Sequence, residues 1–161
     1  MNKFNEDNLV EQTVISLIKE LWQDEGCHIN AFSELEDQKL GRAGRDGVLL
    51  IPTLRKSLIH LNPNVPIESI EEAMLELSRD RSTLPLVRAN QEIYKLLKDG
   101  LNVDIISGED KQETVTVKYI DFENVDNNHY QIVSQLWILG ETYTKRPDVI
   151  LFVNGIPILL F

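Results

Sequence analysis

The sequence has almost no cysteine and no long apolar run. Cys27 is the only cysteine in 161 residues, so no internal disulfide is possible, and a reducing, cytoplasmic setting fits this composition best. The most apolar stretch, residues 149–161, is interrupted by Asn154-Gly155 and Pro157, and it is shorter than the roughly 20 residues that cross a bilayer as a helix. The first residues lack the basic and apolar segments of a secretory signal. We therefore expect a soluble protein with no membrane partner.

Basic residues are scarce as well. The chain contains 16 lysines and arginines against 26 aspartates and glutamates, which gives a formal net charge of −10. Proteins that bind nucleic acid by themselves usually present a basic face, because contacts with phosphate dominate their affinity. The composition argues against an autonomous DNA-binding domain. If the protein acts on DNA, other segments or subunits must hold the duplex.

What remains is the composition of an ordinary globular protein. Apolar residues make up 42% and charged residues 26% of the chain, which does not indicate disorder. A chain of 161 residues can bury a core without disulfides, and this one shows no internal repeat or boundary. We interpret residues 1–161 as a single domain.

The order of helical and strand patterns predicts an α/β fold with a mixed central β-sheet flanked by helices. Apolar periodicity, prolines at first-turn positions and a Gly100 cap define the helices, and β-branched and aromatic residues define the strands. The polar residues 33–47 are expected to form a loop. The predicted helices are residues 6–24, 52–60, 66–79 (with Ile70, Met74 and Leu77 on the inner face) and 86–98. The predicted strands are residues 103–106, 114–120, 130–139 and a buried pair within 147–161 around Asn154-Gly155.

Asp148 is a lone carboxylate at the head of an apolar strand. A carboxylate in this place costs free energy unless it is solvated, paired or bound to metal. One interpretation places it at the end of the sheet, in water, where it caps a turn. The other makes it a metal ligand. Residue types alone leave both interpretations open.

The residues around Asp148 resemble a known motif. Arg146-Pro147-Asp148, followed by Leu151-Phe152-Val153-Asn154-Gly155 and Pro157, is similar to the Pro-Asp half of the nuclease motif in the R subunits of type I restriction enzymes. The similarity covers most of the chain. The further landmarks, in the same order, are Phe4-Asn5-Glu6-Asp7, Glu11, Leu61-Asn62-Pro63, Ala89-Asn90, Ile120-Asp121-Phe122, Asn128 and Gln135.

This resemblance implies a restriction-endonuclease-like fold and a magnesium site. It places a Glu-x-Lys directly after Phe161, so that Asp148 and that glutamate would hold Mg²⁺ while the lysine orients the attacking water. Glu11 resembles the helix acid that often completes such sites as a further metal ligand. The alternative for Glu11 is a solvated helix face.

The resemblance also restricts which residues can pair across a hairpin around Asn154-Gly155. A strict two-residue loop would set Asp148 opposite Phe161, and the following position would then point to the other face of the sheet. One extra residue would set Asp148 opposite that following position. We therefore predict a bulged or three-residue connection at residues 154–156.

The resemblance leads to two functions of different classes. In the first, the chain is the N-terminal endonuclease domain of an R subunit of a type I site-specific deoxyribonuclease. It would hydrolyse double-stranded DNA with Mg²⁺, coupled to ATP-driven translocation by downstream motor domains, with methylation and specificity subunits as partners. ATP would serve the full-length subunit only, and the 161-residue chain alone is expected to be inactive. In the second, the fold is a non-catalytic docking or assembly domain, or a gene remnant.

Other polar motifs are weaker. An unrelated α/β enzyme would need a pocket centred away from Asp148. Lys145 and Arg146 could touch a phosphate or form a solvated pair of loop charges. Gln135 and Trp137 are most simply sheet residues. The adjacent Cys27-His28 does not by itself make a nucleophile–base pair.

Overall fold

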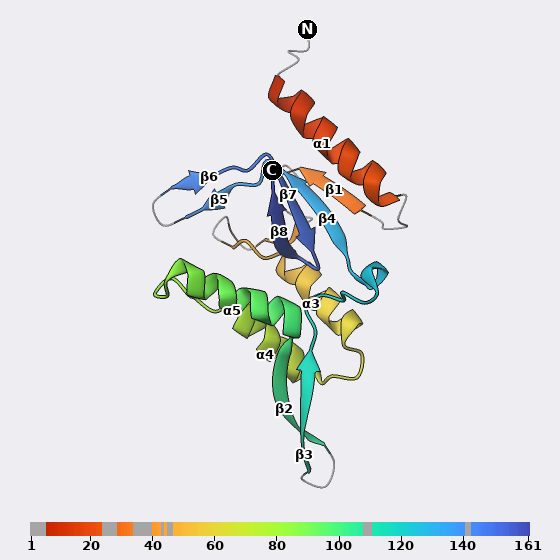
Figure 1. Ribbon diagram of the computed structural model, residues 1–161, viewed down its shortest axis with the longest axis vertical. Coiled ribbons are helices and arrows are strands. Elements are labelled where there is room, and N and C mark those ends of the chain that lie inside the picture. Colours follow the sequence, from red (N-terminus) through yellow and green to blue (C-terminus); the bar gives the residue numbers. More distant parts are fainter. Residues whose placement is uncertain are drawn as a thin grey trace. The chain divides into compact units, whose positions relative to one another are not determined.

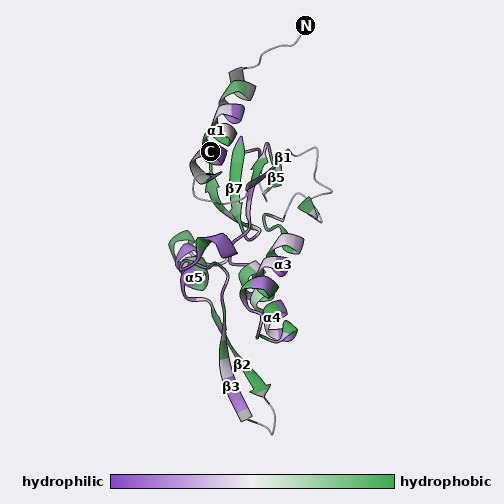
Figure 2. Cartoon of the chain, turned by 90° about the vertical axis from the view of Figure 1, so that its right-hand side faces the viewer, coloured by the Kyte–Doolittle hydropathy of each residue, from purple (hydrophilic) through white to green (hydrophobic). Residues whose placement is uncertain are grey.

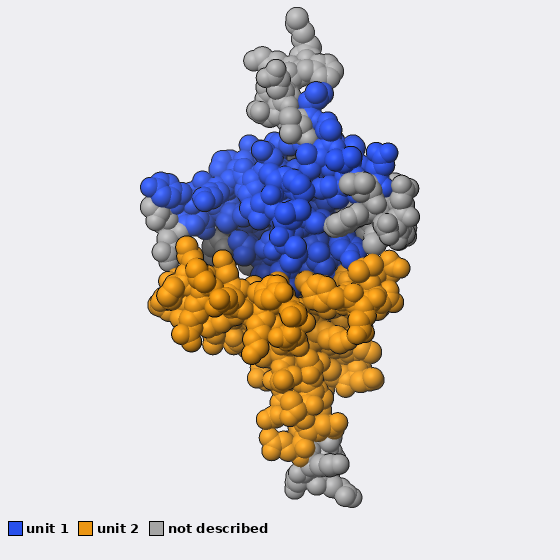
Figure 3. Space-filling view, viewed as in Figure 1, with its two compact units in different colours: residues 1–53, 129–161 blue, residues 54–128 orange. Residues whose placement is uncertain are grey.

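The computed structural model describes residues 6–23, 29–33, 40–42, 44, 47–107, 111–140 and 143–161. The chain divides into two compact units, shown in different colours in Figure 3. Unit 1 combines residues 1–53 with 129–161, and unit 2 is the intervening segment, residues 54–128. Unit 2 is thus inserted in sequence between the two halves of unit 1. The single-domain interpretation of residues 1–161 stays a prediction.

Unit 1 contains a four-stranded mixed sheet in the order β1-β4-β7-β8. Strand β1 runs parallel to β4, whereas β4, β7 and β8 are antiparallel to their neighbours. The mixed sheet together with the helices confirms the predicted α/β class. The bounds of its strands are β1 Ile29–Ser33, β4 Tyr130–Ser134, β7 Val149–Val153 and β8 Ile156–Leu160.

Apolar residues cover both faces of this sheet. On one face, Ile132 and Leu151 pack with Ile15 of helix α1 (Glu6–Gln23), which lies alongside β1 in Figure 1. On the other face, Phe152 packs with Leu50 and with other buried apolar residues. Every residue of β7 is therefore buried, which explains why this strand is hydrophobic throughout rather than alternating (Figure 2).

The predicted strand at residues 130–139 is interrupted, and that prediction is wrong in this respect. Strand β4 ends at Ser134, because Gln135 adopts a left-handed backbone conformation with φ of 57°. The chain then enters a two-stranded hairpin, β5 (Ile138–Leu139) and β6 (Thr144–Lys145). Strand β1 was not predicted at all. Its five residues lie in a short, mixed stretch without a clear period.

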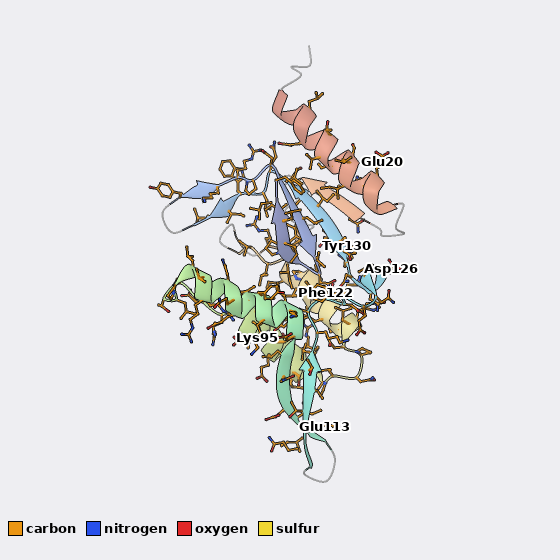
Figure 4. The ribbon with its side chains drawn as sticks, viewed as in Figure 1. Glu20, Lys95, Glu113, Phe122, Asp126 and Tyr130 are labelled. Carbon is orange, nitrogen blue, oxygen red and sulfur yellow. The ribbon has the colours of Figure 1, made fainter. Side chains whose placement is uncertain are left out.

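Unit 2 contains the helical part that the sequence predicted. Helix α3 begins at the end of the first segment of unit 1, and the predicted inner residues of α4, namely Ile70, Met74 and Leu77, are buried. Charged residues such as Lys95 on α5 and Glu113 on β3 are exposed (Figure 4). The elements are α3 (Ile51–Leu61), α4 (Ile67–Ser78), α5 (Leu86–Asp99), the antiparallel hairpin β2 (Leu101–Ser107) and β3 (Lys111–Val117), and the 3-10 helix η2 (Val125–Asn127).

Buried and partly buried hydrogen bonds join the helices of unit 2 to the residues that follow β3. Asn62 Nδ2 donates to the carbonyls of Leu58 (2.8 Å) and Lys118 (2.9 Å), and the Lys118 N–H donates to Asn62 Oδ1 (2.8 Å). The hydroxyl of the fully buried Tyr119 donates to the Ala73 carbonyl of α4 at 2.7 Å. Among the described residues, no helix combines the length and apolar character needed to cross a membrane.

Candidate functional site

Asp148 lies immediately before β7, at one end of the sheet of unit 1. Its side chain is exposed, whereas the next residue, Val149, is buried. Its backbone carbonyl accepts a hydrogen bond from the N–H of Gln135 at 2.9 Å, which fixes the main chain at this point. The carboxylate is thus accessible to a ligand from solvent. Both interpretations of Asp148, a solvated end of a strand and a metal ligand, require this accessibility, and its role stays a prediction.

Glu11 is buried in helix α1, with only 4% of its surface exposed. The alternative of a solvated helix face is therefore wrong for Glu11. A second glutamate of the same helix, Glu20, is exposed, as Figure 4 shows. A buried carboxylate needs a hydrogen-bond partner. The side-chain amide of Gln135 provides one, because its Nε2 donates to Glu11 Oε1.

Gln135 connects the two predicted site residues. Its backbone N–H bonds to Asp148 and its side-chain Nε2 to Glu11. Arg146 donates through Nη2 to the side-chain Oε1 of Gln135 and through Nε to its backbone carbonyl, at 3.4 Å for the latter. All four polar groups of Gln135 therefore have partners, and these partners come from α1 and from the segment that enters β7.

The guanidinium group of Arg146 is also held by an aromatic ring. Its central carbon lies 5.2 Å from the centroid of Trp137, within the range of a cation–π contact. Arg146 and the neighbouring Lys145 are both exposed. Two cations thus lie within three residues of Asp148 in an otherwise acidic chain, which suits the binding of an anionic group such as phosphate.

The loop between β7 and β8 differs from the prediction. Val153 pairs with Ile156, so the connection is a tight two-residue turn, and the predicted bulged or three-residue connection at residues 154–156 is wrong. Asn154 and Gly155 both have positive φ, 54° and 80°, as a type I′ turn requires. That turn matches the twist of the two strands, so the loop itself needs no extra residue.

The one-residue shift nevertheless exists, farther along the strands. The pairing changes between Leu151 and Phe152, because Phe152 pairs with Pro157 whereas Leu151 pairs with Leu159. Beyond the shift, Val149 and Phe161 exchange backbone hydrogen bonds of 3.3 and 2.9 Å. Asp148 is therefore one residue beyond the Val149–Phe161 pair. A residue that followed Phe161 in a continued strand would pair with Asp148.

Hydrogen bonds of a buried asparagine and of the backbone hold the turn between β7 and β8 in place. Asn154 is fully buried, its N–H donates to the His129 carbonyl at 2.8 Å, and its Oδ1 accepts from the His129 N–H at 2.7 Å. The Leu50 N–H donates to the carbonyl of Gly155 at 2.9 Å. The Asn-Gly pair thus anchors the hairpin from which Asp148 is presented.

The described residues contain no group of three or more His, Cys, Asp or Glu side chains that could hold a metal ion. Mg²⁺, however, is commonly held by one or two carboxylates together with water and substrate phosphate. The exposed carboxylate of Asp148 has the hard oxygen donors and the access that such an ion needs. The Cys27-His28 pair lies outside the described residues.

Two cavities of unit 2 are lined by other residues. The larger, of about 340 Å³, contains the charged residues Glu76, Arg81 and Glu92, and the smaller, of about 210 Å³, lies beside Tyr119. The guanidinium of Arg81 is buried and pairs with Glu76 at 2.9 Å and with Glu92 at 3.3 Å. These charges satisfy one another, as in a structural ion-pair network, so they give the alternative of an unrelated enzyme no support.

Known proteins resemble this chain along nearly all of its length. Residues 3–161 match the family described as type I restriction enzyme R protein N terminus. The type I restriction enzyme HindI endonuclease subunit of Haemophilus influenzae is 37% identical over 129 residues, which are 79% of this chain and 12% of that protein. The putative type I restriction enzyme MjaIXP endonuclease subunit of Methanocaldococcus jannaschii is 29% identical over 167 residues, covering 99% of this chain and 15% of that protein. The chain thus spans less than a sixth of the length of these relatives.

Proposed function

Because this chain belongs to the family of type I restriction enzyme R protein N termini, we propose that it is the DNA-cleaving region of an R subunit. In this proposal the fold is restriction-endonuclease-like, and the reaction is Mg²⁺-dependent hydrolysis of phosphodiester bonds in double-stranded DNA. ATP-driven translocation belongs to other domains of the subunit. Methylation and specificity subunits complete the assembly.

The register of β7 and β8 is the observation that carries the proposal. Val149 pairs with Phe161, so a residue that follows Phe161 in a longer subunit would lie directly across from Asp148 if the strand continued. A glutamate at that position would present its carboxylate beside Asp148, since directly opposed side chains in a sheet lie on the same face. A lysine two residues further on would project from the same face, because side chains alternate along a strand.

Asp148 is the residue of this chain that we assign to the metal. Its exposed carboxylate is free of the sheet's apolar packing, and its main chain is fixed by the bond from Gln135. Bound Mg²⁺ polarises the scissile phosphate and helps to activate water. Glu11 as a further ligand stays a prediction.

Arg146 and Lys145 are the residues that we assign to the DNA backbone. Both are exposed and precede Asp148 by only a few residues. A guanidinium group binds phosphate through two parallel hydrogen bonds. In the proposed reaction these side chains bind and orient the phosphate at the carboxylate, while the net charge of −10 requires other domains or subunits to hold the duplex.

Substitution of Asp148 tests the proposal in the complete R subunit, assembled with its partner subunits. We expect Asp148→Ala to lower the rate of DNA cleavage more than about 100-fold. Loss of a metal ligand should lower the rate more than loss of a residue that only hydrogen-bonds to such a ligand. ATP hydrolysis by the same assembly should be unchanged. Asp126→Ala is the matched control, since Asp126 is an exposed acid in η2 of unit 2 (Figure 4).

Cleavage at the normal rate by the Asp148→Ala subunit would contradict the proposal. It would support instead the docking or assembly function, in which the same fold carries no active carboxylate.

A further inference from the structure

The interactions of Gln135 point to a role in the proposed reaction that its place at the end of a strand does not require. We propose that Gln135 is a positioning residue, which takes its support from the buried Glu11 and holds the guanidinium of Arg146 in the orientation that binds the phosphate beside Asp148. This inference rests on the proposed nuclease function.

The backbone of Gln135 is the first observation in its favour. Its φ of 57° lies in the left-handed region, which costs free energy for a residue with a β-carbon. Such conformations persist where the surrounding structure requires them, and they cluster at functional sites. Here the conformation directs the N–H of Gln135 to the Asp148 carbonyl and its own carbonyl to Arg146.

The chemistry of the side chain is the second observation. Its amide donates to an acid, Glu11, and accepts from a base, Arg146, at the same time. A glutamate at position 135 would accept from Arg146, but it would face the second carboxylate of Glu11. A methionine would neither accept from Arg146 nor donate to Glu11. An asparagine would be one methylene shorter. The neutral amide of this length therefore suits the space between these two charged side chains.

The third observation is the degree to which Arg146 is restrained. An exposed arginine normally keeps several rotatable bonds free, and ordering it costs conformational entropy. Arg146 makes two hydrogen bonds to Gln135 and lies over the ring of Trp137. This entropy is therefore lost during folding rather than on substrate binding, which favours the phosphate complex.

A double-mutant cycle in the complete R subunit tests this role. The variants are Gln135→Met, Arg146→Met and the two together, with Gln112→Met as the control because Gln112 is an exposed glutamine of β3. We expect Gln135→Met to lower the rate of DNA cleavage roughly 10- to 100-fold, with ATP hydrolysis unchanged. The double variant should be no slower than Arg146→Met alone, since Gln135 acts through Arg146.

Three results separate success from failure. Additive losses in the cycle would overturn the role of Gln135. Normal cleavage by Gln135→Met would also overturn it, while inactivity of Asp148→Ala in the same assay would leave the proposed function standing. Normal cleavage by Asp148→Ala would instead remove the function on which this inference rests.

Discussion

At the scale of single residues, the buried Asn154 and the partly buried Gln135 hold the geometry of the candidate site. Asn154 fixes the hairpin turn through His129, and Gln135 fixes the chain at Asp148. Both residues have positive φ despite carrying a side chain. Because each one combines an unfavourable backbone conformation with buried or partly buried hydrogen bonds, substitutions at these positions should separate the two contributions.

Substitution of Asn154 provides that separation. We expect Asn154→Gly to lower the free energy of unfolding by about 1–2 kcal/mol, because it removes the side-chain oxygen that accepts the His129 N–H, while glycine accepts the positive φ. Asn154→Ala should cost about 1 kcal/mol more, since alanine is disfavoured in the left-handed region. Urea unfolding followed by circular dichroism measures both values. An alanine variant as stable as the glycine variant would contradict the contribution assigned to the backbone.

The motif predicted the hairpin at Asn154-Gly155 and singled out Asp148 as a candidate metal ligand, because these residues lie in one short segment whose chemistry is local. The sequence also placed Glu11 and Gln135 among the landmarks of the family. It could not give the contact between them, because the two side chains come from segments 124 residues apart and meet only when α1 packs on the sheet. The positive φ of Gln135 could not be predicted from the sequence either, since glutamine carries no preference for that conformation.

At the scale of elements, long helices were the most predictable part of the fold. Their apolar period is repeated over several turns, so α1, α3, α4 and α5 all lie close to their predicted bounds. Short strands repeat their pattern only once or twice, and β1 was missed for that reason. The position of the bulge could not be predicted either, because a tight Asn-Gly turn and a later shift in β8 give the same final register.

The link between α4 and Tyr119, which follows β3, gives unit 2 a dependence on pH. Burial, reinforced by the negative charge of Glu76, raises the pKa of Tyr119 well above its ordinary value. In the unfolded chain the hydroxyl releases its proton above about pH 10, whereas in the folded chain it keeps the proton to higher pH. The folded state should therefore lose about 1.4 kcal/mol for each pH unit between the unfolded and the folded pKa.

Tyr119→Phe tests this dependence. At neutral pH the variant should be less stable than the parent by about 1 kcal/mol, because the bond to the Ala73 carbonyl is lost. Above about pH 10 the difference should shrink and then reverse, since phenylalanine has no proton to release. Urea unfolding at several pH values from 7 to about 11 measures it, and a constant difference over this range would contradict the assigned pKa shift.

At the scale of the whole molecule, charge determines how the chain can meet DNA. With 26 acidic and 16 basic residues, the chain repels the duplex on average, while Lys145 and Arg146 offer only a local attraction. We expect the 161-residue chain by itself to bind duplex DNA with a Kd weaker than roughly 10⁻⁴ M at physiological salt, at or below ordinary non-specific affinity. Fluorescence anisotropy with a labelled duplex measures this. Micromolar binding would contradict the requirement for additional DNA-holding segments.

The insertion of unit 2 between the two halves of unit 1 also affects the order in which the protein can form. Strand β1 pairs with β4, yet all of unit 2 is synthesised between them. As the chain leaves the ribosome, α1 and β1 emerge before β4 and β7 have been synthesised. The inserted helices can already fold around local contacts at that stage. Of the two units, unit 1 is thus the one that cannot complete its sheet until the inserted unit has been synthesised.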